Sequence, residues 1–235
     1  MSRKVALVIA GSAGLETQIA RVLAPDFDVC INYCHNATRA NALVEELESG
    51  NATATYQDAF VQPRFVALQG DASNKNFITD LVDRVIAIFG RLDVVASNSG
   101  WTRITNFNDM DDNLDDDLWD RTYQCNVKAH YWLMHAVKPY LEATKGSFVT
   151  TASLAGIRPG GSSLPYAISK AAQIHLVKTL AKVCAPNIRV NSQRAQAEAN
   201  QLRRLVAVQD VADVVRMLLV NESMTGQNVV VDCGS

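Results

Sequence analysis

The sequence has little excess charge of either sign and no long apolar run near its start. It holds 22 Lys and Arg against 24 Asp and Glu, a formal net charge of −2, which gives no electrostatic reason to bind nucleic acid or an anionic membrane. The first apolar run, residues 5–8, has the length of a strand and is too short for a spanning helix. The start also lacks the pattern of a signal peptide. We therefore expect a cytoplasmic protein that binds neither nucleic acid nor membranes.

Cysteine and histidine are scarce and scattered. The five cysteines are odd in number and follow no metal-binding spacing, so we expect free buried thiols and no metal site. Two of the four histidines, His130 and His135, lie in an apolar helical stretch, where packing is the expected role. Seven aspartates fall between Asp109 and Asp120. We interpret them as a solvated loop and helix start, because hard-metal sites show a defined loop pattern.

Length and composition favour one globular domain. Hydrophobic residues make up 48% of the chain and charged residues 20%, as in soluble globular proteins. A chain of 235 residues is long enough for one large domain with a well-buried core. We predict a single domain over residues 1–235.

Short apolar runs alternate with longer helical patterns along the whole chain. The predicted strands are 4–11, 28–33, 64–71, 92–100, 146–153, 187–193 and 227–234. The predicted helices are 15–24, 37–49, 76–90, 118–144, 166–185 and 208–220. Strands that are apolar throughout are typical of a parallel sheet covered on both faces. We predict an α/β fold, a single Rossmann-like doubly wound parallel sheet of about seven strands, with ligands bound outside the carboxyl ends of the strands.

A possible acid–base pair follows the fifth predicted strand. Tyr166 and Lys170 are four residues apart, so on a helix they share one face. A lysine ammonium beside a phenol stabilises the phenolate, which lets the phenol exchange a proton with a carbonyl or alcohol oxygen near neutral pH. Ser153, at the end of the preceding strand, could hydrogen-bond the same oxygen.

Four motifs in order resemble those of the short-chain dehydrogenase/reductase family, over nearly the whole chain. They are "SNSG" at 97–100, "CNVKA" with Asn126, "TTASLAG" with Ser153, and "YAISK" with Tyr166 and Lys170. The resemblance implies a catalytic tetrad of Asn126, Ser153, Tyr166 and Lys170. In it Tyr166 is the general acid in reduction, Ser153 orients the carbonyl, Lys170 lowers the phenol pKa and holds the nicotinamide ribose, and Asn126 keeps a water in the proton relay. The hydride would come from a nicotinamide cofactor, because no side chain can supply one.

The glycine-rich loop after the first strand departs from the family pattern T-G-x-x-x-G-x-G. Ala10 stands at the first glycine, where one methyl group is a modest obstacle if its φ is negative. Glu16 stands at the last glycine, where a carboxylate competes with the cofactor pyrophosphate for the helix N–H groups. Cofactor affinity should fall, unless Glu16 turns to solvent or pairs with a basic residue such as Arg39.

The segment after residue 193 also differs from the family. Where the family has a P-G turn and a long substrate-covering segment, this chain has a short stretch with neither residue. We predict a truncated, helical lid and a more open site. Such a site could admit a bulky substrate, or hydride transfer could have been abandoned.

The second predicted strand ends without the carboxylate that selects NAD, so NADP(H) is favoured and NAD is less expected. Arg39 and the turn at 35–36 are candidates for the extra phosphate, and Asp71 resembles the family's adenine contact. Besides Tyr166 and Lys170, the predicted cofactor-binding residues are Gly11, Ser12, Gly14, Leu15, Tyr33, Asn36, Arg39, Asp71, Ala72, Asn98 and Gly100.

Three functions are compatible with these motifs. The first is an NADPH-dependent reductase of a ketone in a small organic molecule, such as a 3-oxoacyl or polyketide-like substrate. The second is a non-redox isomerase, lyase or cyclase on the same scaffold, suggested by Glu16 and the short lid. The third is a nucleotide-sensing or scaffolding protein. The resemblance also implies a homodimer or homotetramer formed through the helices that carry Asn126 and Tyr166.

Overall fold

A seven-stranded parallel β-sheet lies at the centre of the computed structural model. The structure describes residues 3–10, 14–50, 64–195, 201–202 and 205–234. The strands are β1 (Lys4–Ile9), β2 (Phe27–Tyr33), β3 (Phe65–Gln69), β4 (Val94–Ser97), β5 (Ser147–Thr151), β6 (Arg189–Ala195) and β7 (Asn228–Val231). Their order in the sheet is β3-β2-β1-β4-β5-β6-β7. The predicted doubly wound fold is confirmed, with strands that end a few residues earlier than predicted at β4 and β7.

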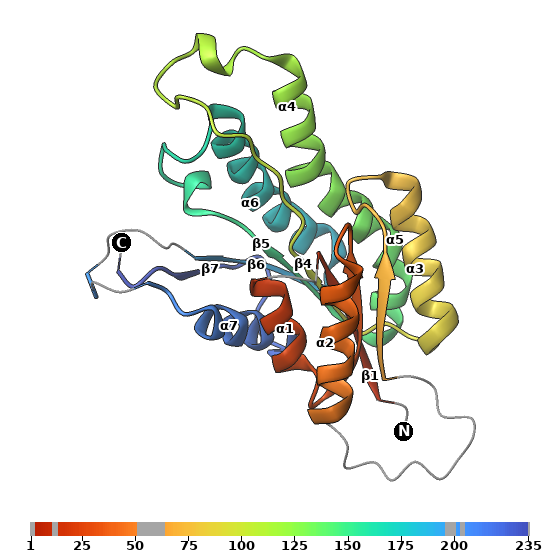
Figure 1. The fold of residues 1–235 in the computed structure, drawn as a ribbon. Helices are drawn as coiled ribbons and strands as arrows, with labels where there is room; N and C mark the ends of the chain where they lie inside the picture. Colours follow the sequence, from red (N-terminus) through yellow and green to blue (C-terminus); the bar gives the residue numbers. More distant parts are fainter. Residues whose placement is uncertain (1–2, 11–13, 51–63, 196–200, 203–204, 235) are drawn as a thin grey trace, which may run out of the picture.

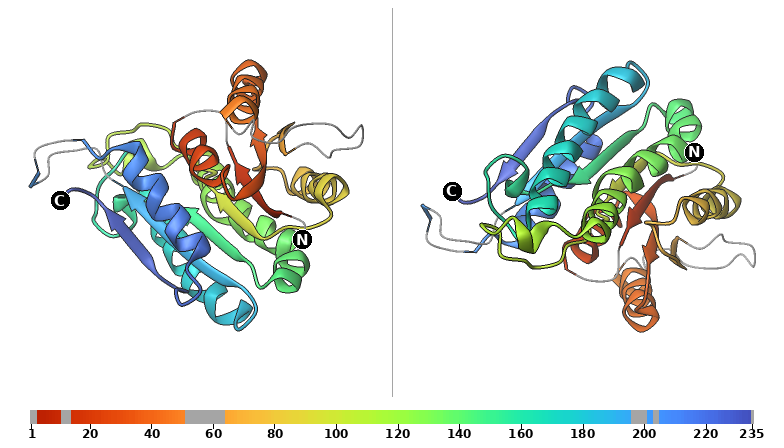
Figure 2. Two further views of the ribbon diagram at one scale, coloured as in Figure 1. Left: turned by 90° about the horizontal axis from the view of Figure 1, so that it is seen from below. Right: turned by 90° about the horizontal axis from the view of Figure 1, so that it is seen from above.

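Helices cover both faces of the sheet. They are α1 (Leu15–Leu23), α2 (Ala37–Gly50), α3 (Lys75–Phe89), α4 (Asp116–Tyr123), α5 (Ala129–Thr144), α6 (Leu164–Cys184) and α7 (Val208–Val220), with short helical turns η1 (Asp111–Asn113), η2 (Gln124–Lys128) and η3 (Leu154–Gly156). Helices α1, α2 and α7 lie on one face, and α3, α5 and α6 on the other (Figures 1 and 2). The predicted continuous helix 118–144 is wrong in one respect, because a π-helical turn over Gln124–Lys128 divides it into α4 and α5.

The two apolar layers explain why the strands are apolar throughout. Side chains alternate between the faces of a strand. In β1, Val5, Leu7 and Ile9 pack into the core beneath α3, α5 and α6, while Ala6 and Val8 pack beneath α1, α2 and α7. Every one of these five side chains is almost completely buried. A strand buried on both sides in this way shows no polar alternation.

The strand order reverses at β1, which pairs with β2 on one side and β4 on the other. In open parallel sheets, ligands bind in the crevice outside the carboxyl ends of the strands at such a reversal. The loops that follow β1 and β4 therefore flank the expected ligand site. Both loops carry the sequence departures and motifs described above.

All five cysteines are free thiols, as predicted. Cys30 and Cys184 are also buried, whereas Cys34, Cys125 and Cys233 are partly exposed, so the expectation of buried thiols is wrong for these three. The aspartate-rich segment forms η1 and the start of α4, where Asp115 caps the helix by accepting from two backbone N–H groups. Within the described ranges, no helix combines the length and the apolar character needed to cross a bilayer.

Candidate active site

Tyr166 and Lys170 lie on one face of α6, in its first two turns. The helix begins at this point because Ser163 caps it, with its Oγ accepting from the backbone N–H of Tyr166 at 3.3 Å, and because Pro165 occupies the first turn. The Lys170 Nζ atom lies 5.8 Å from the centroid of the Tyr166 ring. Tyr166 is half-buried and Lys170 is buried. The sequence spacing of four thus places the ammonium group beside the phenol, as predicted.

Ser153 is held next to this helix by a close backbone contact. It caps the short η3 turn, with its Oγ accepting from the N–H of Ala155 at 3.2 Å. At Gly156, the last residue of that turn, a Cβ would lie 2.6 Å from the carbonyl carbon of Lys170. Only glycine allows η3 to pack this closely on the backbone of α6. The contact therefore fixes the loop that carries Ser153 against the helix that carries the phenol.

Asn126 lies in the π-helical turn between α4 and α5 and is completely buried. Its Oδ1 accepts from the N–H of Trp101 at 2.7 Å, and its Nδ2 donates to the carbonyl of Trp101 at 3.0 Å and to Ser169 Oγ at 2.9 Å. A Cβ on Gly100 would lie 3.6 Å from Asn126 Oδ1 and 3.7 Å from Lys170 Nζ. Gly100, Asn126 and Lys170 thus meet at one point. Such π-helical turns are frequent at functional sites.

Lys170 is held by two acceptors in a water-poor environment. Its Nζ donates to the carbonyl of Thr151 at 3.1 Å and to Gln173 Oε1 at 2.8 Å. Burial lowers the pKa of Lys170 from 10.5 to about 8. The lysine therefore keeps its charge at neutral pH, where an ammonium near the phenol favours the phenolate.

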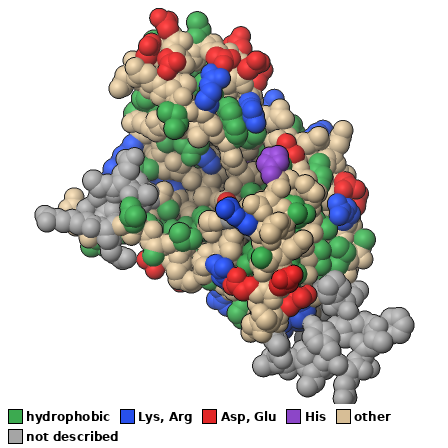
Figure 3. Space-filling view, viewed as in Figure 1, with side chains coloured by type: hydrophobic (Ala, Val, Ile, Leu, Met, Phe, Trp, Pro, Cys, Tyr) green, Lys and Arg blue, Asp and Glu red, His purple; other side chains and the backbone are tan. Residues whose placement is uncertain are grey.

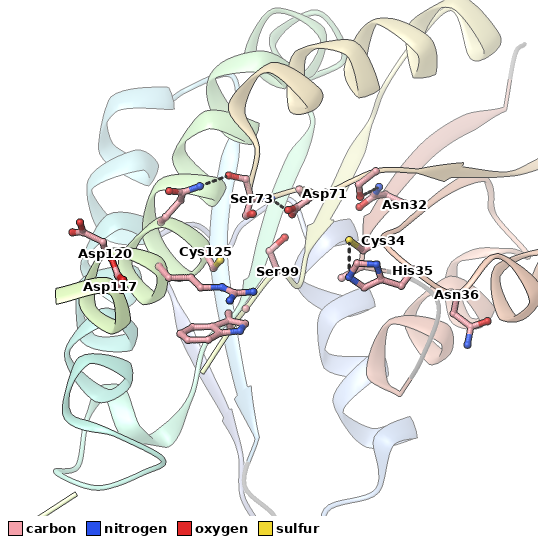
Figure 4. A pocket seen from close by; sticks show the side chains of 17 residues that line it. Asn32, Cys34, His35, Asn36, Asp71, Ser73, Ser99, Asp117, Asp120 and Cys125 are labelled. Carbon is pink, nitrogen blue, oxygen red and sulfur yellow. Dashed lines mark hydrogen bonds between the residues drawn. The ribbon is translucent and has the colours of Figure 1, made fainter. Parts of the chain in front are cut away.

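A second part of the site is a cavity of about 850 Å³ at the carboxyl ends of the strands. It appears as a hollow in the face shown in Figure 3. Acidic side chains gather at the top of this view, over the N-terminal end of α4. Four predicted cofactor residues line it: Asn36, Asp71, Ala72 and Gly100. In Figure 4, Cys34, His35 and Asn36 lie on one side of the cavity, and Asp117 and Asp120 on the other.

Other predicted cofactor residues lie outside the cavity lining. Tyr33 is buried in β2, and the cavity is lined instead by its neighbours Asn32 and Cys34, because successive side chains of a strand point to opposite faces. Arg39 is exposed on α2, and its backbone N–H donates to Asn36 Oδ1 at 2.9 Å, so Asn36 caps that helix. Leu15 packs against the core beneath α1. Gly11 and Ser12 lie outside the described residues.

The loop after β1 turns Glu16 inward. Glu16 lies in the first turn of α1 and is half-buried, and its Oε1 accepts from Asn98 Nδ2 in the loop after β4. Burial raises the pKa of Glu16 from 4.5 to about 7. The sequence left two arrangements in which Glu16 would not lower cofactor affinity: exposure to solvent and pairing with Arg39. The structure shows neither arrangement. The predicted cofactor residue Asn98 is instead the partner of this carboxyl group.

The backbone of the same loop is also strained. Gly14, the N-cap of α1, has φ +65°, a conformation that glycine adopts at little cost. Ala10 has φ +65° as well. The condition under which the methyl group of Ala10 would be only a modest obstacle, a negative φ, is therefore not met.

Arg121 and Trp101 form a wall of the cavity that the sequence did not reveal. The guanidinium of Arg121 lies 4.4 Å from the centroid of the Trp101 ring, within the range of a cation–π contact. Arg121 is also the one Lys or Arg in the described lining of the cavity. The sequence around Arg121 does not show that this side chain lines a cavity. The end of α4 becomes a cavity wall only because it packs near Ser73, whose carbonyl accepts from Gln124 Nε2 at 3.0 Å.

Polar groups at the carboxyl end of β6 have unused hydrogen-bonding capacity. Within the described part of the chain, both amide atoms of Gln193 and two guanidinium nitrogens of Arg194 are buried without a partner. Buried polar groups of this kind are usually satisfied, so these atoms are candidate donors and acceptors for a ligand. The first two residues of the predicted helical lid, Arg194 and Ala195, belong to strand β6, so the helical prediction is wrong there, and residues 196–200 and 203–204 lie outside the described residues.

Comparison with known proteins agrees with this geometry. A family model described as short chain dehydrogenase matches residues 4–197, and the chain belongs to this family of oxidoreductases. It is 29% identical to human dehydrogenase/reductase SDR family member 4, over 100% of this chain and 88% of the relative. It is 32% identical to a Pseudomonas putida cis-1,2-dihydrobenzene-1,2-diol dehydrogenase, over 80% of this chain and 64% of that protein.

Two further relatives cover nearly the whole chain. A Streptomyces violaceoruber protein named for ketoacyl reduction in the granaticin polyketide synthase is 29% identical, over 98% of this chain and 95% of that protein. A short-chain type dehydrogenase/reductase from Mycobacterium ulcerans has the same fold, with a TM-score of 0.85 at 23% identity, covering 100% of this chain and 90% of that chain. The chain spans less than two thirds of the first-mentioned bacterial diol dehydrogenase.

The family implies a nicotinamide cofactor, and the residues of this chain can be tested for a fit to it. The cavity has the size of a small-molecule site, lies at the reversal of strand order, and is lined by polar groups of Asn32, Asn36 and Asp71. Two features disfavour a bound pyrophosphate: the Cβ of Ala10 and the carboxyl group of Glu16. The residues fit the cofactor when the Glu16 carboxyl is protonated or displaced.

Proposed function

We propose that this protein is an NADP(H)-dependent oxidoreductase that reduces a ketone. The observation that carries the proposal is the convergence of four groups at the edge of the sheet. Lys170 Nζ lies near the Tyr166 ring and beside Gly100 and Asn126, and Gly156 presses the Ser153 turn against the backbone of Lys170. These groups come from three separate parts of the chain. A parallel sheet can form without bringing them together.

The side chains have distinct roles in the proposed reduction. A bound nicotinamide cofactor supplies the hydride to the carbonyl carbon. Tyr166 donates its phenolic proton to the carbonyl oxygen, so that the ketone becomes an alcohol. Ser153 holds that oxygen by a hydrogen bond, and the Lys170 ammonium stabilises the phenolate that Tyr166 leaves behind. Asn126 fixes the loop at Trp101 through two hydrogen bonds, ties it to α6 through a third to Ser169 Oγ, and thereby positions Gly100.

The choice of NADP(H) rests on the end of β2. The residues that line the cavity there are Asn32, Cys34, His35 and Asn36, none of which carries a carboxylate. A carboxylate at this place normally binds the ribose hydroxyls of NAD and repels the extra phosphate of NADP. Asp71, which also lines the cavity, is engaged by the N–H of Ser73 at 2.8 Å, and we assign it to the adenine side.

A relative that is covered over most of its own length and is named for ketoacyl reduction supports the substrate class that we propose, a 3-oxoacyl or polyketide-like ketone or another small carbonyl compound. The diol dehydrogenase relative suggests that a vicinal diol should be included among the substrates for the reverse direction.

The decisive experiment is NADPH oxidation with a panel of ketones, followed by absorbance. We expect turnover by the wild-type protein and a loss of about 10³-fold in kcat for Tyr166→Phe, which removes the proton donor. The dissociation constant of NADPH should change far less than kcat, because phenylalanine keeps the aromatic ring and removes only the hydroxyl group that donates the proton. The control is Tyr131→Phe, an exposed tyrosine on α5. A wild-type protein inactive with every ketone and diol would contradict the proposal.

One observation favours a second candidate function, a non-redox isomerase, lyase or cyclase that uses Tyr166 for acid–base chemistry. Glu16 lies where a dinucleotide pyrophosphate would approach, and its carboxyl group is already bonded to Asn98. Calorimetric titration with NADPH separates the two candidates. Micromolar binding supports the reductase, whereas no binding at millimolar concentration supports the non-redox enzyme.

We also propose that the protein forms a homodimer or homotetramer through the helices that carry the site. Tyr131 on α5 and Ile168 and Val183 on α6 are large apolar side chains with exposed fractions of 49%, 47% and 66%. Burial of such side chains favours association. Light scattering of the purified protein measures its mass directly, and a monomer at micromolar concentration would contradict this assignment.

A further inference from the structure

A continuous chain of buried polar side chains runs from the end of β4 to Lys170. Ser97 Oγ lies 2.7 Å from His130 Nδ1, His130 Nε2 lies 3.0 Å from Gln173 Nε2, and Gln173 Oε1 lies 2.8 Å from Lys170 Nζ. The exposed fractions of these four residues lie between 0% and 4%. Ser97 ends β4, His130 is on α5, and Gln173 and Lys170 are on α6. The chain therefore ties three elements to one lysine.

The orientation of the Gln173 amide is fixed by its neighbours. The Gln173 nitrogen lies 3.1 Å from the carbonyl oxygen of Thr151, and a carbonyl oxygen can only accept, so the NH₂ group must be at this end. The other end of the amide is then an oxygen, which faces Lys170 Nζ. If the amide were reversed, an NH₂ group would face the ammonium and two acceptors would face each other.

The same reasoning fixes the tautomer of His130. Gln173 Nε2 donates one hydrogen to Thr151 and its other hydrogen to His130 Nε2, so this ring nitrogen must be unprotonated. The ring proton is then on Nδ1 and is donated to Ser97 Oγ. Burial and the nearby positive charge of Lys170 lower the pKa of His130 from 6.5 to about 3. The ring is neutral at any pH at which the enzyme would work.

In the described structure, the Lys170 ammonium has hydrogen-bond partners for two of its three N–H groups. Of its three N–H groups, one is donated to the carbonyl of Thr151 and one to Gln173 Oε1. The third is left for the open side of the site, toward Tyr166 and a ligand. The titratable groups that face Lys170 in the described structure are Tyr166 on its own helix and His130 on α5.

We propose that Gln173 and His130 are positioning residues for Lys170: Gln173 holds the ammonium through its amide oxygen, and His130 locks that amide in the required orientation. This inference rests on the proposed function, since it gives Lys170 its catalytic role. Without the amide oxygen, the buried ammonium loses one of two partners, and a hydrogen bond to the charged form is one of the factors that keeps a buried lysine protonated. A packing role alone would predict a loss of stability and no change in the titration of Lys170.

The test is the pH dependence of the Gln173→Met variant, which keeps the size of the side chain and removes its polar atoms. We expect the pKa of Lys170 to fall by about one unit, so that the ammonium beside Tyr166 is lost at lower pH. His130→Leu should lower this pKa by less, because Thr151 still orients the amide. The control is Asn191→Leu on β6, which removes another completely buried amide, one that donates to the carbonyl of Met224 and accepts from the N–H of Gln227; it should lower stability and leave the Lys170 pKa unchanged.

Two measurements keep this inference separate from the proposed function. Titration of Lys170 by NMR with ¹³Cε-labelled lysine needs no activity, and Gln173→Glu should raise the lysine pKa where Gln173→Met lowers it. Nitrogen-15 NMR should show His130 protonated at Nδ1 and unprotonated at Nε2. An unchanged Lys170 pKa in both Gln173 variants, or a His130 proton on Nε2, would overturn the inference even if the enzyme reduces ketones. If no ketone is reduced, a shifted Lys170 pKa still supports it.

Discussion

The two sides of the site differ in how completely their polar side chains are hydrogen-bonded. On the side formed by β4, α5 and α6, Asn126 makes three hydrogen bonds, Gln173 makes three, and Lys170 makes two. On the side formed by β1 and α1, Ala10 has a positive φ and Glu16 is a half-buried carboxyl group with a raised pKa. Under the proposed function, the first side is preorganised for proton transfer, and the second places a strained residue and an ionisable carboxyl group near the expected phosphate site.

This difference suggests which step limits the enzyme. Preorganised hydrogen bonds favour the chemical step because they need no rearrangement during the reaction. A carboxylate near an anionic ligand lowers the affinity for that ligand. We therefore expect cofactor binding, and not proton transfer, to be the weak point of this protein.

The largest effect on folding is expected from Gly156→Ala, which would break the contact between η3 and α6. A Cβ at this position would lie 2.6 Å from the carbonyl carbon of Lys170 and 2.8 Å from the nitrogen of Ala171. Backbone atoms cannot yield as a flexible side chain can, so we expect a loss of about 1–3 kcal/mol in the free energy of unfolding. Denaturation by urea measures this loss. The reductase activity should fall as well, because Ser153 moves away from Tyr166.

Gly50→Ala is the matched control for this variant. Gly50 ends α2, and a Cβ there would have no atom within 4 Å. It should leave the free energy of unfolding unchanged or slightly higher. Equal stability of Gly156→Ala and Gly50→Ala would show that the turn carrying Ser153 is not held by close packing.

A smaller effect is expected on cofactor affinity from Glu16→Gln. The pKa of Glu16 is raised to about 7, so the group is mostly neutral at pH 6 and mostly charged at pH 8. If the charged form repels the cofactor, the dissociation constant of NADPH should rise by about tenfold between these pH values. In Glu16→Gln, which keeps an acceptor for Asn98, the constant should stay at its low-pH value. Fluorescence titration at several pH values checks both expectations.

The exposed Glu48 on α2 provides the control, since Glu48→Gln removes a negative charge far from the loop. This variant should retain the pH dependence of the wild-type protein. A wild-type dissociation constant that is flat from pH 6 to pH 8 would show that the carboxyl group moves away when the cofactor binds, and the contrast between the two sides would then apply only to the free protein.

The parts of this molecule that could be predicted from sequence are those set by local patterns. Strands such as Lys4–Ile9 were recognisable because they are apolar on both faces, and the helix around Tyr166 because of its apolar spacing, although its predicted start lies two residues after the observed one at Leu164. The pairing of Tyr166 with Lys170 follows from the helical repeat alone. The break at Asn126 does not follow from the local residue pattern, because a π-helical turn has no distinct sequence pattern in an otherwise continuous helix.

What could not be predicted depends on contacts between distant segments. His130 looked like a packing residue, since nothing in an apolar helix shows that Ser97 and Gln173 will flank its ring. The direction of Glu16 depends on Asn98, 82 residues along the chain. Both cases involve polar side chains whose partners are defined by tertiary structure, where a sequence motif gives the residue type but not the neighbour.

The smallest expected effect is also the most direct measure of strain on the β1 side. Ala10 adopts φ +65°, which costs a residue with a Cβ roughly 1–2 kcal/mol, whereas glycine adopts it freely. Because glycine also gains entropy in the unfolded chain, Ala10→Gly should raise the free energy of unfolding by only about 0.5–1 kcal/mol. Ala24→Gly, at a residue with φ −53°, should lower it by about the same amount, and urea denaturation of the pair compares them. If both variants are destabilised equally, the loop after β1 is not strained, and the weak affinity expected for the cofactor must be assigned to the charge of Glu16 alone.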